Sequence, residues 1–148
     1  MSKNMFEKIV VVIVIIIMSS TSCTNEMSKE TNDLSPEEIV ELYFTYWSDK
    51  NESNMDSLVK ESKRSADFDL QNLNFVTLES CVKREDKGGW NDAWFDNPYD
   101  YVCVDVSFSV EYKSGFGGGF DNGTYKWQYY LVKETKDSDW IIVMWGSG

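Results

Sequence analysis

The sequence predicts an α+β fold, with N-terminal helices packed on an antiparallel sheet of about four strands. Apolar residues recur at helical spacing early in the folded part, and long stretches of alternating apolar and polar residues follow. The clearest strand pattern spans residues 101–112, where one face is entirely apolar: Val102, Val104, Val106, Phe108, Val110 and Tyr112. Helices followed by a meander of strands favour α+β, because one face of the sheet can then pack on the helices.

The start of the first helix is marked by Ser35. Serine is a favoured N-cap residue, Pro36 suits the first helical position, and Glu38 at the third position completes a capping box. We expect the helix to end near residues 49–50. Its apolar stripe follows the spacing i, i+4, i+7 and i+8, with Ile39, Tyr43, Tyr46 and Trp47.

A shorter second helix is predicted after the first, capped by Asn54 or Asp56. Residues 61–70 are polar and predict no element. Three further strands complete the predicted sheet, at residues 75–85, 124–134 and 140–145. The glycine-rich residues 115–119 lie between two strands, which indicates a hairpin loop and not a phosphate-binding loop.

The N-terminus indicates where the protein works. Lys3 and Lys8 precede ten apolar residues, 9–18, and four small residues then lead to Cys23. This arrangement resembles the lipobox of bacterial lipoproteins, which implies cleavage of a signal peptide (1–22) and an acyl anchor, such as palmitate, on Cys23. Ser20 departs from that pattern, because leucine is usual three residues before the cysteine.

Two alternatives to lipidation stay open. An uncleaved membrane anchor is disfavoured, because residues 9–18 are half of the about 20 apolar residues that span a bilayer. Ordinary signal cleavage would leave Cys23 as a free thiol. Residues 23–34 are polar and aperiodic, as expected for a tether between the anchor and one folded domain, residues 35–148.

Composition excludes several functions. Without residues 1–22 the chain has 12 basic and 24 acidic side chains, a net charge of −12 that disfavours nucleic acids and anionic lipid head groups. The acidic surface suits cationic partners, or it merely maintains solubility. Histidine is absent, which excludes Ser-His-Asp and Cys-His catalysis and most zinc sites. We expect no cofactor and no metal, since Asp and Asn residues near 92–100 and 121–122 lack a calcium-loop spacing.

The strand pattern also predicts a disulfide. Residues 75–85 alternate between one face with Val76, Leu78 and Val82 and an opposite face with Thr77, Glu79, Cys81 and Lys83. Opposing Cys81 and Cys103 in a hairpin centres its loop on Asp92, in a turn-like segment. Such a pair is close enough for a disulfide in an oxidising compartment. Two unpaired thiols are the alternative.

Aromatic residues make up 15% of the chain and form the candidate binding residues. Those expected to line a cavity, or simply to fill the core, are Tyr43, Trp47, Trp127, Tyr129 and Trp140. Trp90 and Trp94 lie in a polar, glycine-containing connection, where exposed aromatic side chains would indicate an interaction surface.

Two segments carry a family resemblance. Residues 35–47 begin Ser-Pro-Glu-Glu-Ile-Val, and residues 127–148 contain Trp-Gln-Tyr-Tyr-Leu-Val, Asp-Trp-Ile-Ile and Trp-Gly-Ser-Gly. Together they resemble small bacterial lipoproteins of the nuclear-transport-factor-2-like (cystatin-like) superfamily, in a branch of unknown function. The resemblance implies a curved sheet wrapped around the first helix as a cone with one open end. This superfamily includes enzymes, ligand binders and assembly modules, so it implies a fold more than a function.

These observations favour an extracytoplasmic lipoprotein that is not an enzyme. It would bind a peptide, a protein or a small apolar ligand from the outer face of the cell membrane, with no nucleic-acid partner. The alternative is a small isomerase or hydrolase that pairs a carboxylate with a tyrosine hydroxyl inside the cone. No spacing in the sequence places a carboxylate beside a tyrosine, so no catalytic residue is assigned.

Overall fold

The computed structural model describes residues 34–63, 68–89 and 97–147. The predicted signal peptide (1–22), residues 23–33 of the predicted tether and residues 90–96 therefore lie outside the described residues. The helical elements come first: α2 (Pro36–Ser48), α3 (Glu52–Ser57) and the short 3₁₀ helix η2 (Glu61–Lys63). The strands follow: β1 (Leu73–Lys83), β2 (Asp100–Tyr112), β3 (Phe116–Gly117), β4 (Phe120–Asp121), β5 (Gly123–Lys133) and β6 (Ile141–Gly146). The α+β prediction is confirmed.

The N-terminus of α2 forms the predicted capping box. The Glu38 backbone N–H donates to Ser35 Oγ at 3.2 Å, and the Ser35 N–H donates to Glu38 Oε2 at 2.7 Å. These bonds satisfy two donors that the first helical turn would otherwise leave unpaired. The shorter helix α3 begins earlier than expected, because Asn51 and not Asn54 or Asp56 is its N-cap.

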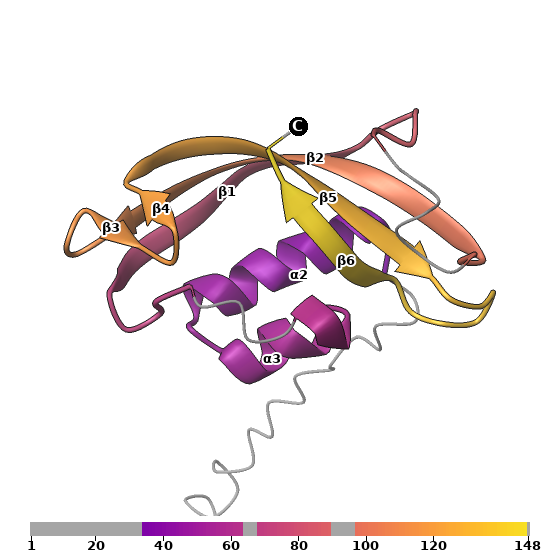
Figure 1. Ribbon diagram of the computed structural model, residues 1–148, viewed down its shortest axis with the longest axis horizontal. Coiled ribbons are helices and arrows are strands. Elements are labelled where there is room, and N and C mark those ends of the chain that lie inside the picture. The colour runs from indigo at the N-terminus through magenta and orange to yellow at the C-terminus, as the bar shows by residue number, and fades with distance from the viewer. Residues whose placement is uncertain (1–33, 64–67, 90–96, 148) are drawn as a thin grey trace, which may run out of the picture.

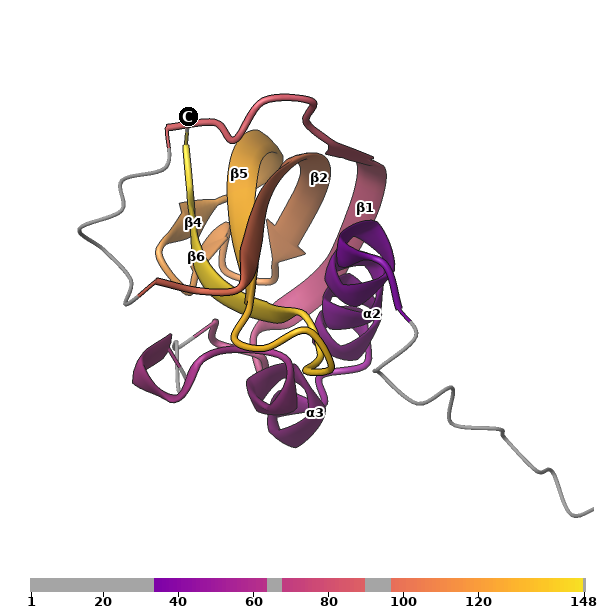
Figure 2. The ribbon, with the colours of Figure 1, turned by 90° about the vertical axis from the view of Figure 1, so that its right-hand side faces the viewer.

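The four long strands form one antiparallel sheet in the order β1-β2-β5-β6. Figure 1 shows this sheet arching over α2, and Figure 2 shows α2 lying beneath β1, with α3 below it. We call the side toward α2 the inner face and the opposite side the outer face. The predicted apolar face of β2 is buried against the helix, so the period-two pattern placed it correctly.

A β-bulge in β1 overturns the predicted register. Leu78 pairs with Phe108, but Ser80 pairs with Ser107, so one extra residue lies between these pairs and the strand changes face there. Cys81 therefore pairs with Val106 and joins the inner core, whereas Val82 is 61% exposed on the outer face. The sequence pattern had predicted the reverse, with Cys81 on the polar face of the strand and Val82 on its apolar face.

The predicted disulfide is wrong for the same reason. Cys103 packs in a small cluster on the outer face with Tyr130, Val132 and Val143, whereas Cys81 lies on the inner face. Both cysteines are free thiols. Without the bulge, the register of Leu78 and Phe108 would set Cys81 opposite Asp105, two residues from Cys103 but on the same face. The bulge then moves Cys81 to the opposite face from Cys103.

The glycine-rich segment forms the small hairpin β3–β4 beside the end of β2. Gly118 has φ +56, and a Cβ atom there would lie 2.7 Å from the Phe68 Cα atom, so only glycine fits this close approach. The side chain of Asn122 accepts from the Tyr112 N–H at 2.7 Å and donates to its carbonyl at 3.2 Å. Asn122 thus serves the turn that precedes β5.

The segment after α3 joins the sheet at β6. The Lys60 N–H donates to the Ile142 carbonyl at 2.8 Å, and the Ile142 N–H donates to the Leu58 carbonyl at 2.9 Å. Val59 forms a parallel bridge with Ile142 between these bonds. This attachment holds α3 against the sheet and places one wall of the pocket described below.

Candidate functional site

Aromatic side chains fill the space between α2 and the inner face. The Trp47 ring lies 4.6 Å from the Phe68 ring and 5.7 Å from that of Phe108, measured between centroids. Four of the candidate cavity residues pack in or against this core: Trp47, Trp127, Tyr129 and Trp140. Their burial provides much of the apolar stabilisation of the domain.

Two of the candidate aromatic residues line pockets. Trp127 lines a hollow of about 460 Å³ beside β2 and β5, and Tyr43 lines a smaller pocket next to the helices. The Tyr43 pocket has a volume of about 210 Å³ and lies between α2, α3 and residues 68–71. Its lining combines apolar and charged side chains: Tyr43, Glu52, Met55, Asp56, Val59, Lys63, Phe68, Asp69, Leu70 and Gln71. Typical sites for drug-sized ligands measure about 300–1,000 Å³, so this pocket suits a smaller molecule.

The Tyr43 side chain is 2% exposed. Burial, and then the negative charge of Asp56, raise the pKa of its hydroxyl well above the usual value, and both residues line the pocket. The Tyr43 hydroxyl differs from that of Tyr129, which is fully buried and has no hydrogen-bond partner within the described residues. Because the Tyr43 hydroxyl stays protonated, it can donate one hydrogen bond and accept another from a bound molecule.

Local structure explains how the wall residues reach the pocket. Glu52 and Asp56 are four residues apart on α3 and therefore share one face of that helix. Met55 is buried and anchors α3 in the core. On the opposite wall, Phe68 packs on Trp47, and Asp69 has a left-handed backbone with φ 47, a conformation that Asp tolerates better than most residues.

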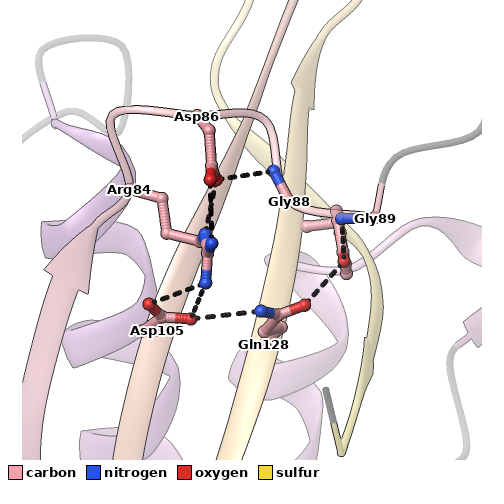
Figure 3. Close-up of polar contacts among 7 residues, drawn as sticks. Arg84, Asp86, Gly88, Gly89, Asp105 and Gln128 are labelled. Carbon is pink, nitrogen blue, oxygen red and sulfur yellow. Dashed lines mark hydrogen bonds and ion pairs between the residues drawn. The ribbon is translucent and has the colours of Figure 1, made fainter.

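A second polar cluster lies on the outer face (Figure 3). Arg84 Nε donates to Asp86 Oδ1 at 2.6 Å, and Arg84 Nη1 donates to Asp105 Oδ2 at 3.2 Å. Gln128 Nε2 also donates to Asp105 Oδ1, at 3.3 Å. The Arg84 guanidinium and the Gly88 N–H hold the pKa of Asp86 at about 2. We call this cluster the outer-face network.

The outer-face network fixes the segment that follows β1. The Gly89 N–H donates to the Tyr130 hydroxyl at 3.1 Å, and that hydroxyl donates to Gln128 Oε1 at 2.8 Å (Figure 3). Residues 84–89 are thereby tied to β2 and β5. They lead toward Trp90 and Trp94, the predicted interaction residues, which lie outside the described residues.

The two thiols are not poised for chemistry. Burial, with lesser contributions from Glu41 and Glu37, raises the pKa of Cys81 to about 12. Burial also raises the pKa of Cys103. Both cysteines therefore remain protonated at neutral pH, and the thiolate is the nucleophilic form. In residues 34–63, 68–89 and 97–147, no group of three or more potential ligands could hold a metal ion.

Comparison with protein families identifies the domain. The family model described as Domain of unknown function (DUF4829) matches residues 37–146. The chain belongs to this family. The predicted membership of a family of unknown function is thus confirmed, and the matched residues span α2 through β6. No curated protein and no solved structure matches the chain.

Most of the pocket was not predicted from the sequence. Tyr43 was a candidate, but its partners Glu52, Asp56, Lys63 and Asp69 were not. The acidic spacing on α3 was a usable signal, since residues four apart share a helix face. The other wall lies in a polar stretch with no periodicity, so no sequence signal indicated that it would fold back onto Tyr43.

Proposed function

We propose that this DUF4829 domain is a non-catalytic binding module, anchored by Cys23 to the extracytoplasmic face of the cell membrane. The observation that carries the binding role is Tyr43, a residue that is 2% exposed and lines a pocket of about 210 Å³, where its hydroxyl is open to a bound molecule. A hydrogen bond within a protein site contributes about 0.5–1.5 kcal/mol net. A small ligand that hydrogen-bonds the Tyr43 hydroxyl gains a contribution of this size.

The proposed location is supported by the N-terminal sequence. A basic start, an apolar stretch, small residues and then Cys23 match the order of a lipoprotein signal, and a polar tether follows. Within the described residues, no helix is long and apolar enough to cross a membrane. Cys23→Ser should release the protein from the membrane fraction, and unchanged membrane association would contradict lipidation at this residue.

The arched sheet around α2 supports the proposed nuclear-transport-factor-2-like architecture. In such a cone, a large apolar ligand would occupy the space beside the first helix. Here Phe44, Trp47 and Tyr129 already occupy that space, and all three are buried. The binding role therefore belongs to the smaller pocket at the α3 side, and a large apolar ligand inside the sheet is disfavoured.

The alternative is a small enzyme in the same pocket. Asp56 and Tyr43 both line it, and the charge of Asp56 acts on the Tyr43 hydroxyl, so a carboxylate and a protonated tyrosine meet there. A carboxylate base with a hydroxyl donor can move a proton next to a carbonyl group. Such an enzyme would catalyse deuterium exchange into a small enolisable ketone, and Asp56→Asn would abolish that exchange.

Native mass spectrometry of the full chain, released gently from detergent, tests the binding function. We expect an additional small mass on the folded wild-type protein, and a lower occupancy in Tyr43→Phe, which removes only the hydroxyl. Tyr46→Phe is the matched control, because Tyr46 lies on the same helix but does not line the pocket. A bare protein that no small molecule stabilises in a thermal-shift panel would contradict the proposal.

A further inference from the structure

We infer that the Tyr43 pocket selects small organic cations, in particular a primary or quaternary amine with a short aliphatic chain. This inference rests on the proposed binding function and specifies the ligand class. It is carried by two features that meet in one place: a pocket lined by Tyr43, a residue that is 2% exposed, and a described lining in which carboxylates outnumber cations.

The charges of the pocket favour a cation. Glu52, Asp56 and Asp69 carry negative charges, and Lys63 is the single cation among the described lining residues. Asp56 and Asp69 already take part in other polar interactions, and the inference needs only their charge. Because charges in a partly enclosed site are screened less than on an open surface, an anionic ligand is repelled and a cation is attracted.

The apolar part of the lining favours an organic cation over a metal ion. Phe68 and Tyr43 offer aromatic rings to an ammonium group or its methylenes, and Met55, Val59 and Leu70 offer aliphatic contacts. A metal ion would need several oxygen ligands at short distance. No group of potential metal ligands occurs in the described part of the chain.

The Tyr43 hydroxyl gives the site a directional contact. The N–H of a primary ammonium group, or the hydroxyl of choline, can donate to the Tyr43 hydroxyl oxygen, while the charge of the ligand lies near the carboxylates of α3. A neutral alcohol of the same length would keep the hydrogen bond but lose the charge interaction. A carboxylate of the same length would keep the hydrogen bond and add repulsion.

This difference defines the experiment. The binding of n-butylammonium, 1-butanol and butyrate to the full chain in detergent is measured by isothermal titration calorimetry, with choline as a second cation. n-Butylammonium, 1-butanol and butyrate each have four carbon atoms and differ in charge at nearly constant size. We expect binding of n-butylammonium and choline, at least tenfold weaker binding of 1-butanol, and no binding of butyrate.

Variants locate the effect. Glu52→Gln and Asp56→Asn should each weaken n-butylammonium binding by roughly two- to fivefold, typical of losing one partly exposed charge interaction. Lys63→Gln should strengthen it, since this change removes the opposing cation. Glu134→Gln is the matched control, because Glu134 is exposed and lies outside the pocket lining. The unfolding midpoint of each unliganded variant verifies that it folds.

The outcomes separate this inference from the proposed function. Equal binding of 1-butanol or butyrate would overturn the cation selectivity and leave a binding module in place. Unchanged n-butylammonium affinity in both Glu52→Gln and Asp56→Asn would also overturn the cation selectivity and leave the binding module in place. If none of the four probes bound but the purified protein still carried an additional mass that Tyr43→Phe reduces, only the proposed selectivity for cations would be wrong. A bare protein that binds none of the probes contradicts both proposals.

Discussion

The Tyr129 hydroxyl lies in the core with no hydrogen-bond partner among the described residues. Burial, and then the neighbouring Tyr43, raise the pKa of this hydroxyl well above its usual value. A buried unpaired hydroxyl costs about 1–3 kcal/mol of stability. Tyr129→Phe removes the hydroxyl and keeps the ring, so we expect the free energy of unfolding to rise by about 1 kcal/mol. The melting temperature should increase by about 3–6 °C for a domain of this size.

Tyr112→Phe is the matched control. The Tyr112 hydroxyl is also buried, but it donates to the Phe68 carbonyl at 2.9 Å. Its removal should therefore lower the free energy of unfolding by about 1–2 kcal/mol, because the buried carbonyl loses its donor. Urea denaturation of both variants, followed by tryptophan fluorescence, measures the two effects. A loss of stability in Tyr129→Phe would refute the reasoning, since it would reveal a partner for that hydroxyl.

Four further changes have expected results. Gly118→Ala should destabilise the domain by about 2 kcal/mol, because its φ of +56 disfavours a side chain and a Cβ atom would meet backbone. Ser35→Ala should cost about 1 kcal/mol through loss of the capping box. Amide protection after β1 should persist down to a pH of about 4 and disappear as the pH approaches 2, where the lowered pKa of Asp86 lies. Cys81 and Cys103 should resist alkylation at neutral pH in the native protein, and unreduced denatured protein should accept a label at each.

Each of these predictions has its own control. Gly146→Ala adds a Cβ atom with nothing within 4 Å and should leave stability unchanged, so equal losses at both glycines would contradict the packing argument. Ser57→Ala changes a serine outside any N-cap, and it should cost less than Ser35→Ala. In Asp86→Asn, the loss of amide protection should no longer depend on pH between 2 and 4. If Cys81 and Cys103 did not both accept a label in the unreduced denatured protein, the prediction of two free thiols would be wrong.

The predicted elements succeeded where local chemistry decided the outcome. Ser35, Pro36 and Glu38 specify the start of α2 through neighbouring backbone groups, and the long alternation of β2 specifies its buried face. The Cys81–Cys103 pairing failed because the predicted register was off by two residues and because it assumed a strand without a bulge. The bulge after Leu78 depends on how β1 packs against α2 and β2, which no local pattern in β1 encodes.

The amino-acid sequence by itself determined the order of helices and strands, the capping of α2, the apolar face of β2 and the acidic, histidine-free character of the chain. It did so because capping and amphipathic periodicity act between residues a few positions apart. The tertiary structure alone decided which face each thiol occupies and which side chains surround Tyr43. Residues 52–56 and 68–71 reach that pocket because the chain between β1 and α2 folds back and pairs with β6. Such long-range contacts depend on packing across the whole domain, so the sequence of a single segment does not predict them.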